Sequence, residues 1–332
     1  MTLSFAGPSL AGPSLAGPSL AGLSIPAPDA ITLDDIIAMY EALRPYMPSA
    51  VPPLSPTREV SHLVEILPHV DALILDGFGV INVGAVVIDG IKEVLEMAAA
   101  RDIAVMVLTN GAGQGADATW AKYRDWGLPI TRPQVVSSRD SLEAALPVVA
   151  ADRIVAALGP HARALGVENE LSLADDPDLF DRAQSFAFLA SAGWDDSLQA
   201  ALEAALARDG RDLLVGNPDI SAPLGDVFSA EPGYWALRAM QATGIVPRWY
   251  GKPHGAAFNL AFAKLEQVYG RQFDRNRVAM VGDSLHTDIL GARAAGLQAV
   301  LLTGYGLFSD GGAHDMIEAC AIAPDWIAAT LQ

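Results

Sequence analysis

The chain has 332 residues, of which 39 are acidic and 21 basic, so its formal net charge at pH 7 is -18. This acidic excess argues against broad nucleic-acid binding, because little basic surface is left to neutralise a phosphate backbone. Hydrophobic residues make up 51% of the sequence, which is enough for a sizeable core. No apolar run approaches the ~18–20 residues that a membrane span needs. The single cysteine, Cys320, excludes an internal disulfide framework and is typical of a reducing compartment, so we expect a cytoplasmic protein.

Residues 1–30 contain three copies of the pentapeptide Ala-Gly-Pro-Ser-Leu, at 6–10, 11–15 and 16–20. Such a Gly/Pro/Ser repeat has neither a helical nor a strand period, and it predicts a disordered, low-complexity tail over 1–30. A secretory signal needs a basic segment near the N-terminus, whereas the first basic residue here is Arg44.

The first ordered elements are expected just after this tail. Thr32 and Asp35 have the spacing of a capping box, which predicts a helix to about Tyr46. Several prolines make the next stretch irregular, and a second helix is expected over about 61–67.

Apolar strands and helices then alternate, as in the βαβ units of a parallel sheet. The expected strands are 72–75, 104–108, 134–136, 278–281 and 298–303, with helices at 90–101, 117–126 and 256–269. Continuous apolar runs of this kind are typical of strands buried on both faces. Between them lie further strand candidates at 154–158, 185–189 and 213–215 and a helix at 195–208. The sequence therefore predicts an α/β protein with a Rossmann-like, doubly wound parallel sheet built from 31–139 and 246–332, interrupted by an inserted α/β module at 140–245.

Polar residues follow three of the predicted core strands. Asp76 ends the first, Thr109 and Asn110 end the second, and Asp283 with Asp288 follows a later one. Ligands bind beyond the carboxyl ends of strands in open α/β sheets, so we expect these side chains to meet there. Lys252, in a Gly-Lys-Pro turn, is expected to join them.

This set of side chains suits phosphoryl transfer. Two carboxylates, Asp76 and Asp283, favour a hard cation such as Mg²⁺, which leaves coordination positions for water and phosphate. Lys252 supplies a point charge for phosphate, and the Thr109 hydroxyl and backbone amides can bond phosphate oxygens. A carboxylate such as Asp76 can also act as a nucleophile and form an aspartyl-phosphate intermediate.

In order along the chain, these four segments resemble the four motifs of the haloacid dehalogenase (HAD) superfamily of phosphatases. The insert, with Asn217-Pro218-Asp219 followed by Pro232-Gly233, is similar to that of the class IIA branch, where it forms an α/β cap over the active site. The resemblance covers about residues 60–305. It implies a Mg²⁺-dependent phosphatase of a small phosphorylated metabolite. Trp194, Trp235 and Trp249 are expected to pack the cap, or to form a homodimer contact through the cap as seen among relatives.

The resemblance also implies roles for individual residues. Asp76 would be the nucleophile and, with Asp283 and the backbone carbonyl of Phe78, a metal ligand. Thr109, Asn110 and Lys252 would bind phosphate, and Asp288 would ligate the metal or orient the residues that do. Asn217 and Asp219 would face the substrate from the cap, although both residue types also favour turns for local reasons.

One position departs from the family pattern. Most of these phosphatases carry a second aspartate two residues after the nucleophile, where it transfers protons, but here that position is Phe78. Losing general acid–base help costs ~10²–10⁴ in rate. His254 and His286 are candidate replacements by sequence proximity, although solvent-exposed loop positions are the expectation for both.

Two alternative functions stay open at this point. The first is a catalytically weak protein that binds a phosphometabolite on a HAD scaffold, which Phe78 favours. The second is hydrolysis at carbon, as in dehalogenases, which would not require Mg²⁺.

Overall fold

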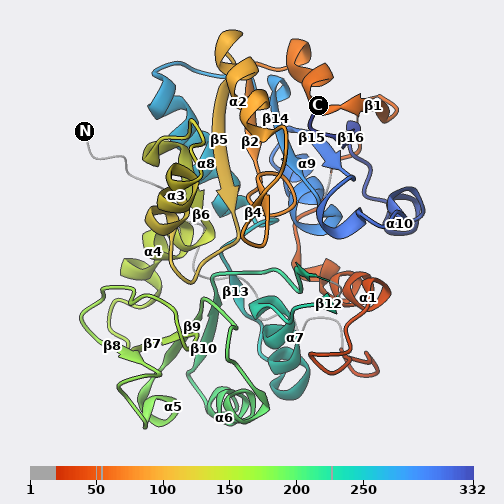
Figure 1. The fold of residues 1–332 in the computed structure, drawn as a ribbon. Helices are drawn as coiled ribbons and strands as arrows, with labels where there is room; N and C mark the ends of the chain where they lie inside the picture. Colours follow the sequence, from red (N-terminus) through yellow and green to blue (C-terminus); the bar gives the residue numbers. More distant parts are fainter. Residues whose placement is uncertain (1–19, 50, 54, 226) are drawn as a thin grey trace.

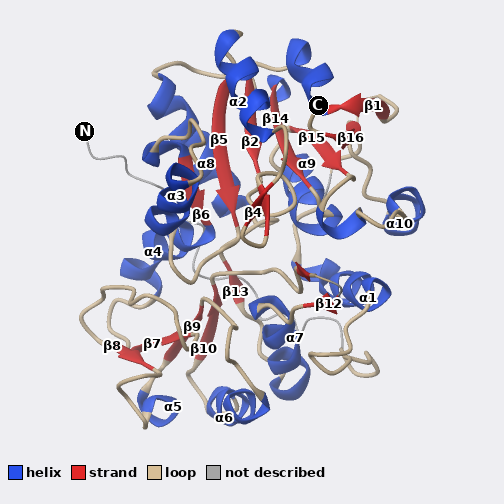
Figure 2. Cartoon of the chain, viewed as in Figure 1, coloured by secondary structure: helices blue, strands red, loops and turns tan. Residues whose placement is uncertain are grey.

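The computed structural model describes residues 20–49, 51–53, 55–225 and 227–332, so most of the predicted disordered repeat, over 1–19, lies outside the described residues. The chain forms two lobes, each built around its own parallel sheet (Figure 1). Helices flank both sheets (Figure 2). Over the described ranges, none of the helices is both long enough and apolar enough to cross a membrane.

The larger lobe, which we call the core, contains a seven-stranded sheet in the order β1-β16-β15-β14-β2-β5-β6, and every neighbouring pair is parallel. Its strands are β1 (Arg58–His62), β2 (Ala72–Leu75), β5 (Ala104–Thr109), β6 (Val135–Ser137), β14 (Val278–Gly282), β15 (Gln298–Leu302) and β16 (Trp326–Thr330). At the centre, Leu75 of β2 lies opposite Val107 of β5 and Val281 of β14, so the carboxyl ends of these three strands meet. The predicted Rossmann-like α/β fold is confirmed.

Both faces of the core sheet are covered at its centre, which explains why the inner strands β2, β5, β14 and β15 are mostly apolar. In β2, Ala72 and Ile74 face one hydrophobic cluster, and Leu73 and Leu75 face the other. Helix α8 (Gly255–Tyr269) packs on the first side and α2 (Ile91–Ala100) on the second. The other helices of this lobe are α3 (Ala116–Asp125), α4 (Ser138–Val149), α9 (Leu290–Ala294) and α10 (Ala313–Cys320).

The smaller lobe, which we call the cap, is built from residues between β6 and α8. Its five-stranded parallel sheet has the order β13-β10-β9-β7-β8. The strands are β7 (Val155–Leu158), β8 (Glu170–Ser172), β9 (Ser185–Phe188), β10 (Asp212–Val215) and β13 (Arg248–Trp249), and the helices are α5 (Leu179–Arg182), α6 (Asp196–Leu206) and α7 (Pro232–Thr243). Two short hairpins complete the description: β3 (Asn82–Val83) with β4 (Val86–Val87), and β11 (Pro223–Leu224) with β12 (Val227–Phe228).

An N-terminal segment, residues 20–46, contacts both lobes. Helix α1 (Leu33–Leu43) begins at the expected capping box, in which Asp35 N donates to Thr32 Oγ1 at 3.2 Å and Thr32 N to Asp35 Oδ2 at 3.0 Å. From the middle of α1, Tyr40 accepts a hydrogen bond from the backbone of Ile220 in the cap at 3.1 Å. The Tyr40 ring also stacks on His286 of the core, with ring centroids 4.9 Å apart.

One expectation for the N-terminal region, a disordered tail that extends to residue 30, is wrong. Residues 20–30 are ordered against α7, where Tyr234 donates to the Pro26 carbonyl at 2.6 Å and Gln241 to the carbonyls of Leu20 and Leu23. Their leucine and isoleucine side chains pack against the main hydrophobic cluster, and the repeat pattern did not indicate this burial of apolar surface. The helix expected over 61–67 is confirmed in part: a 3₁₀ helix spans Leu63–His69, whereas residues 61–62 belong to edge strand β1, which pairs with the distant β16.

Candidate active site

The predicted nucleophile lies at the end of the central strand β2. Asp76 is 8% exposed, and its backbone N–H donates to Val281 O at 2.9 Å, which fixes it between two strands. Its Oδ1 accepts a hydrogen bond from the N–H of Gly77 at 2.6 Å. Glycine is required at 79, since φ is +74° and a Cβ there would lie 2.4 Å from Asp283 Oδ2. The absence of a side chain at Gly79 therefore allows the loop after Asp76 to pass close to the Asp283 carboxylate.

Lys252 lies at the centre of the site and is 1% exposed. Its Nζ is 2.6 Å from Asp76 Oδ1 and 2.7 Å from Asp288 Oδ1. Asn110 holds its backbone on both sides, accepting from Lys252 N at 2.8 Å and donating to Lys252 O at 3.1 Å. The second and third motifs are thus joined by hydrogen bonds, and the ammonium group is fixed beside the nucleophile.

Three buried carboxylates, from Asp76, Asp283 and Asp288, each place an oxygen atom within 4.8 Å of the others. Asp283 Oδ2 accepts from Leu307 N at 2.9 Å, and Asp288 Oδ2 accepts from Ser284 N at 3.1 Å, so both side chains are oriented by the backbone. Hard carboxylate oxygens of this kind are the ligands that Mg²⁺ and Ca²⁺ prefer. With one lysine facing three carboxylates, the cluster fits a divalent cation.

The pKa values reflect this crowding. Burial raises the pKa of Asp76 to about 7 against the opposing effect of Lys252. Burial, followed by the charges of Asp288 and Asp76, also raises the pKa of Asp283. For Lys252, burial lowers the pKa, but the carboxylates of Asp288 and Asp76 more than compensate and the net shift is upward. Lys252 therefore stays charged at neutral pH.

The phosphate-binding candidates Thr109 and Asn110 end strand β5. Thr109 Oγ1 accepts from Gly111 N at 3.2 Å, and its hydroxyl proton has no acceptor among the described residues. A Cβ on Gly77 would lie 3.4 Å from the same oxygen, so the hydroxyl is next to the Asp76 loop. The side chain of Asn110, in contrast, makes hydrogen bonds to the backbone of Lys252 and to Asp219 of the cap, and its contact with phosphate stays a prediction.

The cap brings one predicted residue into contact with the core. Asp219 Oδ1 accepts from Asn110 Nδ2 at 2.7 Å across the two lobes. Asn217 shapes the loop instead, because its Oδ1 accepts from Asp219 N at 2.9 Å and its Nδ2 donates to Glu231 at 3.3 Å. Close approach depends on Gly251, where a Cβ would lie 2.3 Å from the Pro218 ring.

The two histidines are not in exposed loops, which corrects the expectation for them. His286 is fully buried, stacks on Tyr40 and lies 2.7 Å from Glu41 Oε1 through its Nε2 atom. His254 is half-buried and stacks on Trp249 with centroids 5.8 Å apart, and burial lowers its pKa to about 4. Phe78, whose backbone bridges to Asn82, is also half-buried.

Sequence reasoning missed the part that Tyr40 plays near the site. Burial, followed by the charge of Asp219, raises its pKa well above the usual value, and the charges of Asp288 and Asp283 act in the same direction. No motif marks this tyrosine. The only signal is the apolar stripe of α1, which indicates a buried face without saying against what.

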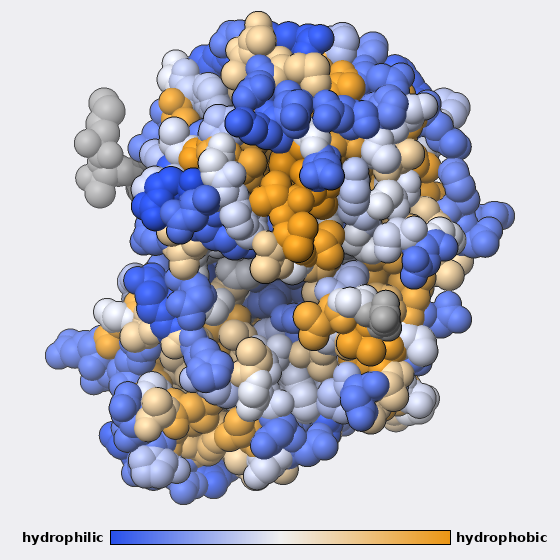
Figure 3. Space-filling model, viewed as in Figure 1, coloured by the Kyte–Doolittle hydropathy of each residue, from blue (hydrophilic) through white to orange (hydrophobic). Residues whose placement is uncertain are grey.

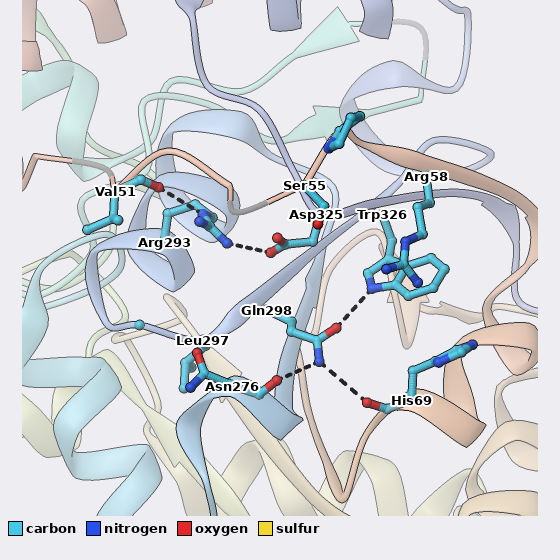
Figure 4. A pocket seen from close by; sticks show the side chains of 12 residues that line it. Val51, Ser55, Arg58, His69, Asn276, Arg293, Leu297, Gln298, Asp325 and Trp326 are labelled. Atoms are coloured by element: carbon cyan, nitrogen blue, oxygen red, sulfur yellow. Dashed lines mark hydrogen bonds and ion pairs between the residues drawn. The ribbon is translucent and has the colours of Figure 1, made fainter.

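The molecular surface is hollowed between the core and the cap (Figure 3). A different hollow lies at the amino ends of β15 and β16, at the opposite end of these strands from the acidic cluster (Figure 4). Its polar groups satisfy one another: Gln298 donates to Asn276 O at 2.6 Å and accepts from Trp326, and Arg293 pairs with Asp325 at 2.6 Å. This second hollow holds none of the motif residues.

Comparisons with known proteins agree with the geometry. A haloacid dehalogenase-like hydrolase model matches residues 73–171, and a second HAD hydrolase-like model matches 249–332. A D-glycerol 3-phosphate phosphatase of Mycobacterium tuberculosis is 31% identical over 249 residues, which is 70% of this chain and 63% of that protein. The chain therefore spans less than two thirds of that relative's length.

Solved structures show the same architecture. A possible sugar phosphatase of the HAD superfamily from Cytophaga hutchinsonii has a TM-score of 0.73 and 23% identity, covering 82% of this chain and 98% of its own. A glycerol phosphate phosphatase from Mycobacterium tuberculosis in complex with calcium has a TM-score of 0.57 and 26% identity, covering 71% and 65%. With four motifs on one sheet edge and HAD-type models matching residues 73–171 and 249–332, the chain belongs to the haloacid dehalogenase superfamily of hydrolases.

Proposed function

We propose that this protein is a Mg²⁺-dependent phosphatase that hydrolyses a small phosphate monoester through an aspartyl-phosphate intermediate. One observation carries the proposal: the buried Lys252 ammonium lies 2.6 Å from Asp76 Oδ1 inside a cluster of three carboxylates. Pure binding of an anion does not need a buried carboxylate beside the phosphate site, whereas a nucleophile has to be there.

The residues divide the work as follows. Lys252 and the Thr109 hydroxyl hold the phosphate, and an Asp76 oxygen attacks phosphorus. Asp76 and Asp283, with the Phe78 carbonyl, would hold the cation, while Asp288 orients Lys252. When bound, the cation supplies positive charge that offsets the charge on the phosphate.

The names of relatives support the substrate class that we propose. One relative carries the name D-glycerol 3-phosphate phosphatase, and one structural neighbour is described as a possible sugar phosphatase. We therefore propose a small polyol or sugar phosphate, bound between the core and the cap in a cytoplasmic setting. A homodimer through the cap is part of the same proposal.

The test is phosphate release from glycerol phosphate, a panel of sugar phosphates and p-nitrophenyl phosphate, with Mg²⁺ and with EDTA. We expect Mg²⁺-dependent release that is abolished by Asp76→Asn. The matched control is Asp71→Asn, at the other end of the same strand, where an exposed carboxylate pairs with Arg277 at 2.7 Å. Equal activity of the two variants, or release that ignores Mg²⁺, would refute the assignment.

A second function, binding of a phosphometabolite without useful turnover, is favoured only by the phenyl group at 78. It would be recognised by calorimetric binding of a sugar phosphate with 1:1 stoichiometry and no phosphate release in the same sample.

A further inference from the structure

An alkyl phosphate cannot be cleaved efficiently without a proton donor. When the bond from phosphorus to the ester oxygen breaks, that oxygen leaves as an alkoxide, a strong base that must be protonated in the transition state. The phenyl ring of Phe78 has no proton to give. A different side chain must therefore supply it if the proposed phosphatase function is correct.

Most ionisable groups around the site are unsuited to this task. Lys252 is held as a cation by contacts of 2.6 and 2.7 Å to two carboxylates. His286 points to Glu41 and His254 stacks on Trp249, so neither side chain is directed at the cluster. Tyr40 keeps its proton, because burial and the nearby carboxylates raise its pKa well above the usual value.

Asp219 lies next to the core residues of the site. It lies in the loop after cap strand β10. In this loop the Pro218 ring packs against Gly251, the residue before Lys252. Its Oδ1 is anchored by Asn110 at 2.7 Å, and the same Asn110 amide is 3.1 Å from the Lys252 carbonyl. Its Oδ2 makes no hydrogen bond among the described residues and is not sealed from the surface. One oxygen is thus fixed and the other is available to a ligand.

The surroundings of Asp219 bring its pKa close to neutral pH. Burial raises its pKa to about 7, opposed by Lys252 and by the Asn110 hydrogen bond and assisted by Glu231 and Asp288. Catalytic acids work best when their pKa is close to the working pH.

We propose that Asp219 is the proton-transfer residue of this enzyme and takes over from the cap the task that Phe78 cannot perform. This rests on the proposed phosphatase function. In the first step an Asp76 oxygen forms a bond to phosphorus, the bond from phosphorus to the ester oxygen breaks, and that oxygen takes the proton of Asp219. In the second step water attacks phosphorus, the bond to Asp76 breaks and Asp219 recovers a proton from the water, which releases phosphate.

The test uses Asp219→Asn, which keeps an oxygen for the Asn110 contact but cannot transfer a proton. With p-nitrophenyl phosphate, whose leaving group needs no proton, we expect the stoichiometric burst of p-nitrophenol to keep its rate while later turnover slows. With glycerol phosphate, we expect the first turnover itself to slow by ~10²–10⁴. Asp209→Asn, at an exposed cap position, is the matched control and should change neither.

A rescue experiment separates proton transfer from a structural role. Adding Phe78→Asp to Asp219→Asn should restore glycerol phosphate hydrolysis, because a carboxyl group is then available from the core. An equal loss of burst rate for both substrates, with no rescue, would show that Asp219 only ties cap to core and would overturn the inference. Normal hydrolysis by Asp219→Asn would overturn it as well, and would leave the phosphatase function intact. Absence of turnover in the unmodified protein would instead refute the phosphatase function.

Discussion

Replacing Lys252 by methionine removes the one cation from a buried cluster of carboxylates. At an effective dielectric constant of ~20, each of its two contacts contributes about 6 kcal/mol of attraction. Much of this is offset by the cost of burying the ammonium group. Removing one partner of a buried pair nevertheless costs about 3–5 kcal/mol, because the remaining charges are left uncompensated. We expect a fall in Tm of roughly 5 °C.

The assay is thermal unfolding in EDTA, with Lys264→Met as the matched control. Lys264 is 3.7 Å from Asp140 at a partly exposed position, so its loss should cost at most about 1 kcal/mol. The loss of thermal stability caused by Lys252→Met, which we call the deficit, should also depend on pH. The pKa of Asp76 is raised to about 7 even though Lys252 lowers it, so removing Lys252 raises this pKa further. The repulsion between the carboxylates should therefore grow as pH rises through 7 and be relieved as pH falls towards the unfolded pKa of about 4. A deficit equal to that of the control at pH 8, or unchanged at pH 5, would refute the reasoning.

Four further outcomes are expected. Gly79→Ala should cost about 1–3 kcal/mol in chemical unfolding and impair activity, because φ is +74° and the new methyl group meets Asp283; normal stability would contradict this. Asp283→Asn should raise the Mg²⁺ concentration for half-maximal activity by roughly 10–100-fold, measured by metal titration, and an unchanged midpoint would remove it from the metal site. Tyr40→Phe should lower the unfolding free energy by about 1–3 kcal/mol, because the Ile220 N–H loses its acceptor, and a neutral effect would count against that bond. Alkyl phosphate hydrolysis should decline above pH about 7 as Asp219 loses its proton, and this alkaline limb should be absent from the pH profile of Asp219→Asn.

The sequence was sufficient to predict the core because its signals are local. Strand β2 is apolar on both faces and ends in Asp76, and the same pattern recurs at Thr109 and Asp283, so parallel pairing alone brings these residues together. The contact of Lys252 with Asp76 follows from the same topology.

What the sequence could not provide were contacts that depend on distant segments. Edge strand β1 has a mostly polar pattern and exists because it pairs with β16, about 270 residues away. The burial of His286 depends on Tyr40 and Glu41, which come from a helix with no motif. The pairing of Asp219 with Asn110 joins a cap turn to a core strand end, and the turn residues alone favour only a local role.

The order of strands in the core sheet determines how late in synthesis this sheet can finish folding. Strand β2 gains β5 early, but its other neighbour, β14, is translated about 200 residues later, and β16 ends at Thr330 of 332 residues. The cap sheet, in contrast, is drawn entirely from residues 155–249 and can close before β14 emerges. During that interval β2 is an apolar strand with one open edge, a template for pairing with other chains. The nascent chain is therefore expected to need chaperone protection until its last strands leave the exit tunnel.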